Sequence, residues 1–259
     1  MSDTPIDVFI DLPSFPGPVQ AGRLWSHFRK GRESASFEYN KEWLANPHRF
    51  ALEPLLPLAD GTFHTNPGQS VFGAIGDSTP DRWGRILMRR AELARARTAN
   101  ESPHTLSELD YLLRVNDEAR QGALRFSQDG GQSFCAPPGS TPIPPLVNLS
   151  RLLHAADHFC RDDENAEDLR LLLAPGSSLG GARPKASVKD KKGNLCVAKF
   201  PRYDDEYNVV AWEAVALTLA SKAGLQVPRF ELEKITDKDV LIVWRFDRTR
   251  EQRRISYLS

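Results

Sequence analysis

Alternating apolar and polar positions open the chain and predict short β-strands. The alternation covers residues 7–12, 21–25 and 35–39, with Pro or Gly between the runs. Because successive side chains of a strand point to opposite faces, these runs predict an antiparallel meander with one buried face. A further strand, expected over residues 122–126, would close this sheet.

Helical spacing appears between these strands. Pro80 suits a first helical turn, and Trp83, Ile86, Leu87 and Ala91 follow at helical intervals. The charges between residues 82 and 97 are mainly basic, which suits either a solvated helix face or a contact with phosphate or a partner. A second helix is expected over residues 105–114.

Composition changes after residue 128. Glycine and proline become frequent between Asp129 and Pro145, which is typical of a linker. We therefore predict an N-terminal domain over residues 1–128, a linker over 129–149 and a second domain over 150–259.

In the second domain the sequence pattern predicts helices followed by paired strands. Ser150 and Asn165 are candidate N-caps, and an apolar stripe of Val209, Trp212, Ala216, Leu219 and Ala223 marks a longer helix. An α+β fold follows, and its closing order of strand, strand, helix, strand, strand is that of a kinase small lobe. The expected helices are 150–160, 166–173 and 205–223, and the expected strands are 186–188, 195–199, 229–234 and 240–245.

Charge and cysteine content exclude several classes of protein. Lys plus Arg (34) balance Asp plus Glu (34), so no global field favours nucleic acid or a membrane. The three cysteines lack the spacing of a zinc site or a disulfide framework. Neither a signal peptide nor an apolar run of about 20 residues is visible, so we expect a cytoplasmic protein.

A glycine-rich turn over residues 176–181 is the main candidate for chemistry. Glycines let backbone N–H groups approach phosphate oxygens. The turn is not a Walker A loop, because Ala182 and Arg183 stand where Lys and Ser or Thr belong, and GxGxxG is absent. A plain hairpin turn and a phosphate-binding loop both remain open.

Lys199 favours the phosphate interpretation. It ends a mostly apolar strand, where an unpaired ammonium is costly. In kinases such a lysine holds the α- and β-phosphates and pairs with a glutamate of the next helix, and Glu213 has the matching place. The strand over 240–248 would then lead into the hinge under adenine. Residues 158–165 look like a catalytic loop but precede the glycine turn, so we interpret them as a capped helix end.

In these stretches the chain resembles the HipA family of serine/threonine toxin kinases of toxin–antitoxin modules. The resemblance covers nearly the whole chain. The stretches that carry it are 77–83, 122–124, 178–185, 198–201, Glu213 and 245–248.

The resemblance implies an ATP site. Lys199 would contact ATP, Glu213 would steady Lys199, and Ser178, with Ser177 as a neighbouring candidate, would be the autophosphorylated serine. The implied phosphate-binding loop is Gly180, Gly181, Ala182, Arg183, Pro184 and Lys185, and the implied adenine hinge is Trp244, Arg245 and Phe246. An acidic residue is expected at position 244, so Trp244 departs from the family pattern.

The resemblance also implies partners and a missing lobe. Family members use ATP and Mg²⁺, phosphorylate a protein such as an aminoacyl-tRNA synthetase, and are neutralised by a HipB-like helix-turn-helix antitoxin that binds DNA. Their catalytic and magnesium-binding residues lie in a helical lobe beyond the hinge, so we expect residues 1–259 to be inactive alone. The alternative is a non-catalytic module that binds an antitoxin or a separately encoded kinase lobe.

Overall fold

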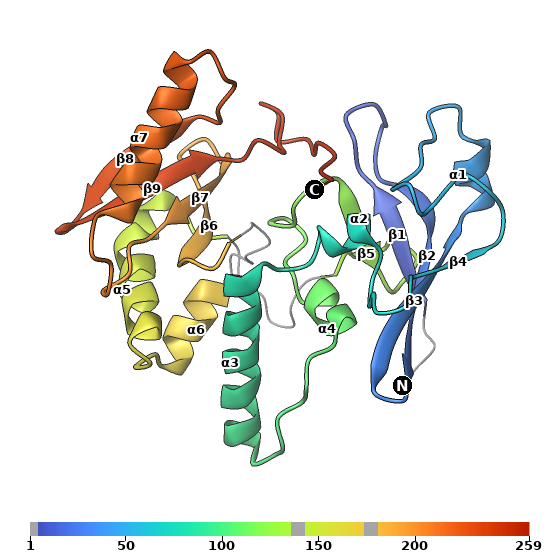
Figure 1. The fold of residues 1–259 in the computed structure, drawn as a ribbon, viewed down its shortest axis with the longest axis horizontal. Helices are drawn as coiled ribbons and strands as arrows, with labels where there is room; N and C mark the ends of the chain where they lie inside the picture. The colour runs from blue at the N-terminus through green and yellow to red at the C-terminus, as the bar shows by residue number, and fades with distance from the viewer. Residues whose placement is uncertain (1–4, 136–142, 174–180, 259) are drawn as a thin grey trace. The chain divides into compact units, whose positions relative to one another are not determined.

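The computed structural model describes residues 5–135, 143–173 and 181–258 and has an α+β fold with two antiparallel sheets (Figure 1). Ser177, Ser178 and Gly180 lie outside the described residues. The chain forms two compact units. The first comprises Met1–Pro80, Thr105–Gly139 and Arg253–Ser259, and the second comprises Asp81–His104 and Ser140–Gln252.

The first unit is built on a five-stranded sheet in the order β4-β3-β2-β1-β5. The predicted meander is confirmed, since β1, β2 and β3 pair antiparallel, and the predicted closing strand pairs with β1. Its strands are β1 (Ile6–Ile10), β2 (Val19–Arg29), β3 (Arg32–Tyr39), β4 (Thr62–His64) and β5 (Leu124–Ser127). Its helices are α1 (Lys41–Ala45), α2 (Gly73–Gly76) and α4 (Glu108–Leu113).

Aromatic side chains fill the core of the first unit. Phe37, Trp43 and Phe126 are fully buried there. β2 and β3 approach so closely that a Cβ at Gly22 would lie 2.2 Å from the Glu38 carbonyl oxygen and 2.5 Å from the Phe37 ring. Glycine is therefore required at position 22 for these strands to pair.

The second unit is built on a four-stranded sheet in the order β6-β7-β9-β8. Ala198 and Ile242 face a core shared with α3, α5 and α6, whereas Leu241 packs against α7. Helices therefore cover both faces of this sheet. The strands are β6 (Lys185–Lys189), β7 (Leu195–Lys199), β8 (Phe230–Ile235) and β9 (Lys238–Trp244). The helices are α3 (Arg82–Ala99), η1 (Leu146–Asn148), α5 (Leu149–Cys160), α6 (Ala166–Leu173) and α7 (Val209–Lys222).

Helix starts confirm some predicted caps and correct others. Asn165 caps α6 as predicted, accepting hydrogen bonds from the N–H groups of Glu167 and Asp168. Ser150 lies inside α5, whose N-cap position is taken by Asn148. The predicted helix over 205–223 begins later, because the Asn208 side chain accepts from Ala211 N and starts α7 at Val209.

The helix predicted after Pro80 is confirmed as α3, but Pro80 is not in its first turn. The N-cap is Asp81, so Pro80 precedes the helix. The basic residues of α3 are partly paired: Arg90 donates to Glu164 at 2.7 Å and also contacts Asp162, and both acidic residues follow α5. This pairing agrees with the interpretation of a charged helix face.

The apolar stripe predicted for α7 is wrong. Val210 and Ala214 are buried, whereas Trp212 and Leu219 are 62% and 60% exposed. The helix is apolar on nearly all sides, so its periodicity offered more than one stripe, and packing on Leu241 selected another one.

The compact units do not follow the predicted ranges 1–128 and 150–259. Residues 81–104 pack in the second unit, because Trp83 and Leu87 of α3 belong to its core. The predicted linker over 129–149 stays a prediction, since part of it lies outside the described residues. No helix in the described ranges is long and apolar enough to cross a membrane.

Candidate functional site

Two lysines face each other across the first two strands of the second sheet. Lys185 of β6 is the register partner of Lys199 of β7. Directly opposed residues of an antiparallel pair lie on the same face, and like charges in that position repel. Each ammonium is therefore expected to have its own carboxylate.

Glu213 provides the carboxylate for Lys199. The two side chains form an ion pair, as the sequence predicted, and they are 31% and 39% exposed. α7 fixes Glu213 there because the adjacent Ala214, together with Val210, packs against the sheet at Leu241. The pair is held in place on one side and reachable from solvent on the other.

Asp81 provides the carboxylate for Lys185. Lys185 Nζ lies 2.6 Å from Asp81 Oδ2, and the two side chains are only 5% and 4% exposed. Burial lowers the pKa of Lys185, and Asp81 opposes that shift. The second contact of Lys185 Nζ is the Gly181 carbonyl oxygen, at 3.2 Å.

Lys185 was predicted to belong to a phosphate-binding loop, and this placement is corrected. It lies within β6, buried and ion-paired. Of the predicted loop, Gly181 and Ala182 are exposed, and Gly181 has a φ of 113°, which only glycine adopts readily. Their backbone is accessible at the end of the strand that carries Lys185.

The next two loop residues have structural contacts. Arg183 forms an ion pair with Asp205. Burial raises the pKa of Asp205, but the hydrogen bonds from Arg183 and the Arg202 N–H, together with the charges of these two arginines, outweigh it and the net shift is downward. Pro184 is buried, and its carbonyl accepts the Phe200 N–H at 3.0 Å. These residues hold the loop base to the segment after β7.

The hinge predicted at Trp244, Arg245 and Phe246 stays a prediction, and two of its backbone N–H groups are bonded within the protein. Trp244 N donates to the Arg229 carbonyl at 2.9 Å, and Arg245 N donates to the Leu195 carbonyl at 3.1 Å. Both N–H groups are thus used within the protein. The Arg245 side chain lies in a buried cluster with Asp247, whereas Phe246 is 56% exposed.

Sequence reasoning missed Asp81 and Trp83 as site residues. Trp83 N donates to the Gly181 carbonyl at 3.3 Å, and Trp83 Nε1 donates to the Lys185 carbonyl at 2.9 Å. Asp81 precedes Lys185 by 104 positions. The stretch 77–83 was noticed for its helical spacing and its resemblance, and nothing in one sequence links it to β6.

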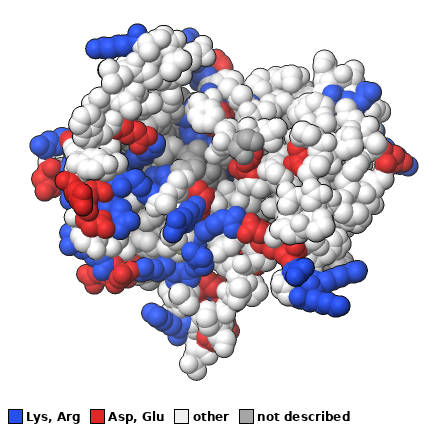
Figure 2. Space-filling view, viewed as in Figure 1, with Lys and Arg blue, Asp and Glu red and all other residues white. Residues whose placement is uncertain are grey.

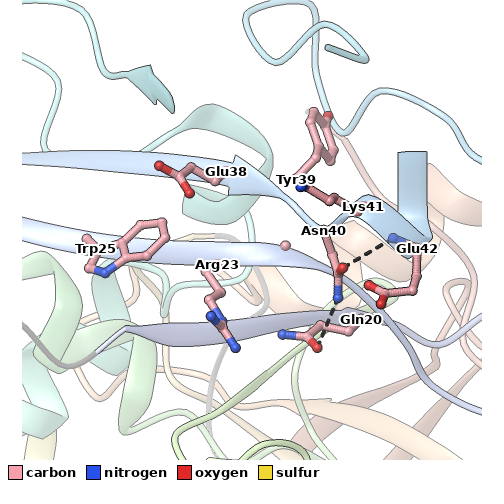
Figure 3. Close-up of a pocket in the computed structure, with 9 residues that line it drawn as sticks. Gln20, Arg23, Trp25, Glu38, Tyr39, Asn40, Lys41 and Glu42 are labelled. Atoms are coloured by element: carbon pink, nitrogen blue, oxygen red, sulfur yellow. Dashed lines mark hydrogen bonds between the residues drawn. The ribbon is translucent and has the colours of Figure 1, made fainter. Parts of the chain in front are cut away.

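A separate groove lies in the first unit (Figure 3). It has a volume of about 450 Å³ and a mostly polar lining that includes Arg23 and Trp25 of β2 and Glu38 of β3. Arg23 Nε donates to Asp7 Oδ1 at 3.0 Å, and Asn40 bridges Gln20 and the Glu42 N–H. Positive and negative groups alternate here, so the groove has no strong preference for an anion.

The donor set at Lys199 suits phosphate better than a metal ion. Ammonium groups and backbone N–H groups bind anions. Within the described ranges, no group of three or more His, Cys, Asp or Glu side chains could hold a metal ion.

Comparison with known proteins agrees with the predicted family. Residues 17–127 match the model of the HipA N-terminal domain, and residues 177–259 match the model of the HipA-like C-terminal domain. A search of curated proteins found no match.

One similar solved chain comes from the Shewanella oneidensis MR-1 toxin–antitoxin complex of HipA, HipB and operator DNA, with a TM-score of 0.48 and 16% identity. The comparison covers 98% of this chain and 54% of that chain, so this chain spans about half of its length. The two matched domain models, one N-terminal and one C-terminal, take in most of the sequence, and the chain belongs to the HipA family.

Proposed function

We propose that the second unit is the nucleotide-binding part of a serine/threonine kinase that transfers the γ-phosphate of ATP to a protein. The observation that carries the proposal is the Lys199–Glu213 ion pair, formed between a sheet strand and the next helix beside an exposed glycine turn. Protein kinases use this pairing to hold the α- and β-phosphates.

Each residue has a distinct role in this proposal. Lys199 binds phosphate oxygens, and Glu213 keeps its ammonium in place when no nucleotide is bound. The backbone of Gly181 and Ala182 lies against the phosphates. Trp244 to Phe246 lie at the adenine edge, where contacts other than the N–H groups of residues 244 and 245 must hold the base. Ser178 and Gly180 complete the loop proposed from the resemblance.

Phosphoryl transfer depends on metal-held charge and on a residue that orients the nucleophile. We assign neither role to any residue between 1 and 259, since no position matches the family's catalytic or magnesium-binding residues. We therefore propose that these 259 residues bind ATP·Mg but do not transfer phosphate by themselves.

The partners proposed for the whole protein follow from its family. They are a HipB-like helix-turn-helix antitoxin, through which contact with DNA would be indirect, and a protein substrate such as an aminoacyl-tRNA synthetase. Co-purification with a helix-turn-helix protein encoded beside the gene would test the first of these.

Hydrogen exchange with and without ATP·Mg tests the nucleotide proposal. Protection is expected in peptides covering residues 181–189 and 195–199, because phosphate contacts would order that end of the sheet. Protection confined to the groove residues 20–25 and 38–42 would contradict it. A labelled-phosphate assay on the same sample tests the absence of transfer, and labelling of a substrate or of Ser178 would contradict that part.

The exposed apolar face of α7 favours a second candidate, a module that binds a separately encoded helical kinase lobe. Trp212, Val215 and Leu219 are exposed on a helix that is apolar nearly all round, which is typical of a helix with a covered surface. Replacing Trp212 and Leu219 by Ser should abolish binding of such a lobe and leave ATP binding unchanged.

A further inference from the structure

Asp81 connects two structural features through its two carboxylate oxygens. Oδ1 accepts the Gly84 N–H at 2.8 Å and caps α3. Oδ2 accepts from Lys185 Nζ at 2.6 Å. The first contact is an ordinary N-cap, whereas the second places a negative charge beside the proposed phosphate site.

Capping alone does not explain a buried charge at this position. The Asp81 and Lys185 side chains are 4% and 5% exposed, and removing two charges from water is costly unless each meets a partner. Asn caps a helix as well as Asp does. The negative charge of Asp81 therefore serves to neutralise Lys185, because α3 needs only a capping oxygen and not a charge.

Lys185 and the three charged groups that face it form a balanced set of four charges. They are Asp81 at the start of α3, Lys199 on the opposite strand and Glu213 on α7, with the Gly181 carbonyl as a neutral acceptor. Without Asp81, two opposed ammonium groups would share Glu213. Lys199 would then compete with Lys185 for the Glu213 carboxylate.

We propose that Asp81 is a positioning residue of the nucleotide site, which neutralises Lys185 and so leaves Glu213 to Lys199. Lys185 holds the base of the glycine turn through the Gly181 carbonyl, and it is not itself a phosphate ligand. The inference deepens the proposed function and rests on it for the role of Lys199. The charge balance itself can be tested without nucleotide.

Thermal unfolding at pH 7 and pH 9 tests the charge balance with three proteins, the wild type, Asp81→Asn and Asp81→Asn with Lys185→Met. Asn preserves the cap and removes the charge. In Asp81→Asn the folded-state pKa of Lys185 falls further below its unfolded value of 10.5, because burial is no longer opposed by Asp81. Between pH 7 and pH 9 the unfolded state of Asp81→Asn then binds more protons than its folded state, so the stability of this variant rises with pH. The loss of stability relative to the wild type therefore shrinks from pH 7 to pH 9.

Lys185→Met in the same background should restore the melting temperature and remove the pH dependence, since it replaces the unpaired buried charge by an apolar chain of similar length. No loss in Asp81→Asn would show that Asp81 acts only as a cap. An equal loss at both pH values, or no recovery in the double variant, would show that the loss does not come from an unpaired Lys185 charge. Each of these results would overturn the inference.

ATP·Mg affinity of the same proteins tests the positioning role. Asp81→Asn should weaken binding at pH 7 by about tenfold, a typical coupling between neighbouring sites, and Lys185→Met should restore it. No recovery of binding when Lys185→Met is added to Asp81→Asn would show that Lys185 is itself a phosphate ligand and contradict the inference. If the wild type binds no ATP, the proposed function fails, while the unfolding data still decide the charge balance.

Discussion

Asp247 lies three residues after the end of β9 and offers a sharp test of how buried charge stabilises the second unit. Its carboxylate accepts from Arg245 Nε at 2.6 Å and from Arg248 Nη1 at 2.8 Å. The side chains of Arg245, Asp247 and Arg248 are 1%, 0% and 3% exposed. Asp247→Asn keeps the shape but leaves two buried guanidinium groups without this counter-charge.

Breaking a buried ion pair by removing one partner costs about 3–5 kcal/mol. Because a domain is stable by about 5–15 kcal/mol in total, Asp247→Asn should remove a large part of the stability of the second unit. Urea unfolding, read by hydrogen exchange in the β9 peptide (residues 238–244), would show the loss in the unit that contains it.

Asp204→Asn is the matched control. Asp204 pairs with Arg202 at 2.8 Å, but the two side chains are 47% and 41% exposed. An exposed pair contributes at most about 1 kcal/mol, so the control should behave nearly as the wild type. A loss below about 1 kcal/mol for Asp247→Asn would refute the argument that the buried cluster depends on its carboxylate.

Three further predictions concern the same unit. Gly181→Ala should lower the melting temperature, at a cost of about 1–3 kcal/mol, because a φ of 113° is strained for alanine; an unchanged melting temperature would contradict this. Burial raises the pKa of Cys196 to about 12, so an aromatic disulfide reagent at pH 8 should label this thiol in urea and not in the native protein. Burial raises the pKa of Asp190, but hydrogen bonds from Asn194 and Trp244 outweigh it and lower the pKa to about 2. The stability gained from Asp190 is present above its unfolded value of 3.8 and is lost as pH falls towards 2, so Asp190→Asn should reduce the acid dependence of unfolding in that range.

Local pattern predicted most of the strands and helices. Alternation located the meander, and the strands expected over 186–188 and 195–199 pair as the β6–β7 hairpin, because both signals are short-range. The α7 stripe failed for a physical reason: a helix that is apolar on all sides does not specify which face is buried. The sheet it packs against decides that.

The candidate site was predicted where its parts follow one another in the chain. Lys199 and Glu213 are 14 positions apart and pair as expected. Asp81 was missed because its partner follows 104 positions later, and Lys185 was placed in the loop although its strand register puts it opposite Lys199. Long-range pairing of buried charges leaves no local periodicity in a single sequence.

Calorimetric titration with ATP·Mg tests the central claim most directly. The proteins are the wild type, Lys199→Ala and Lys192→Ala, the last being an exposed lysine in the hairpin turn before β7. The account predicts that the wild type and Lys192→Ala bind alike and that Lys199→Ala loses at least about tenfold in affinity, since a charge-assisted contact to phosphate is removed. Equal binding by all three, or binding by none, would contradict a nucleotide site at Lys199.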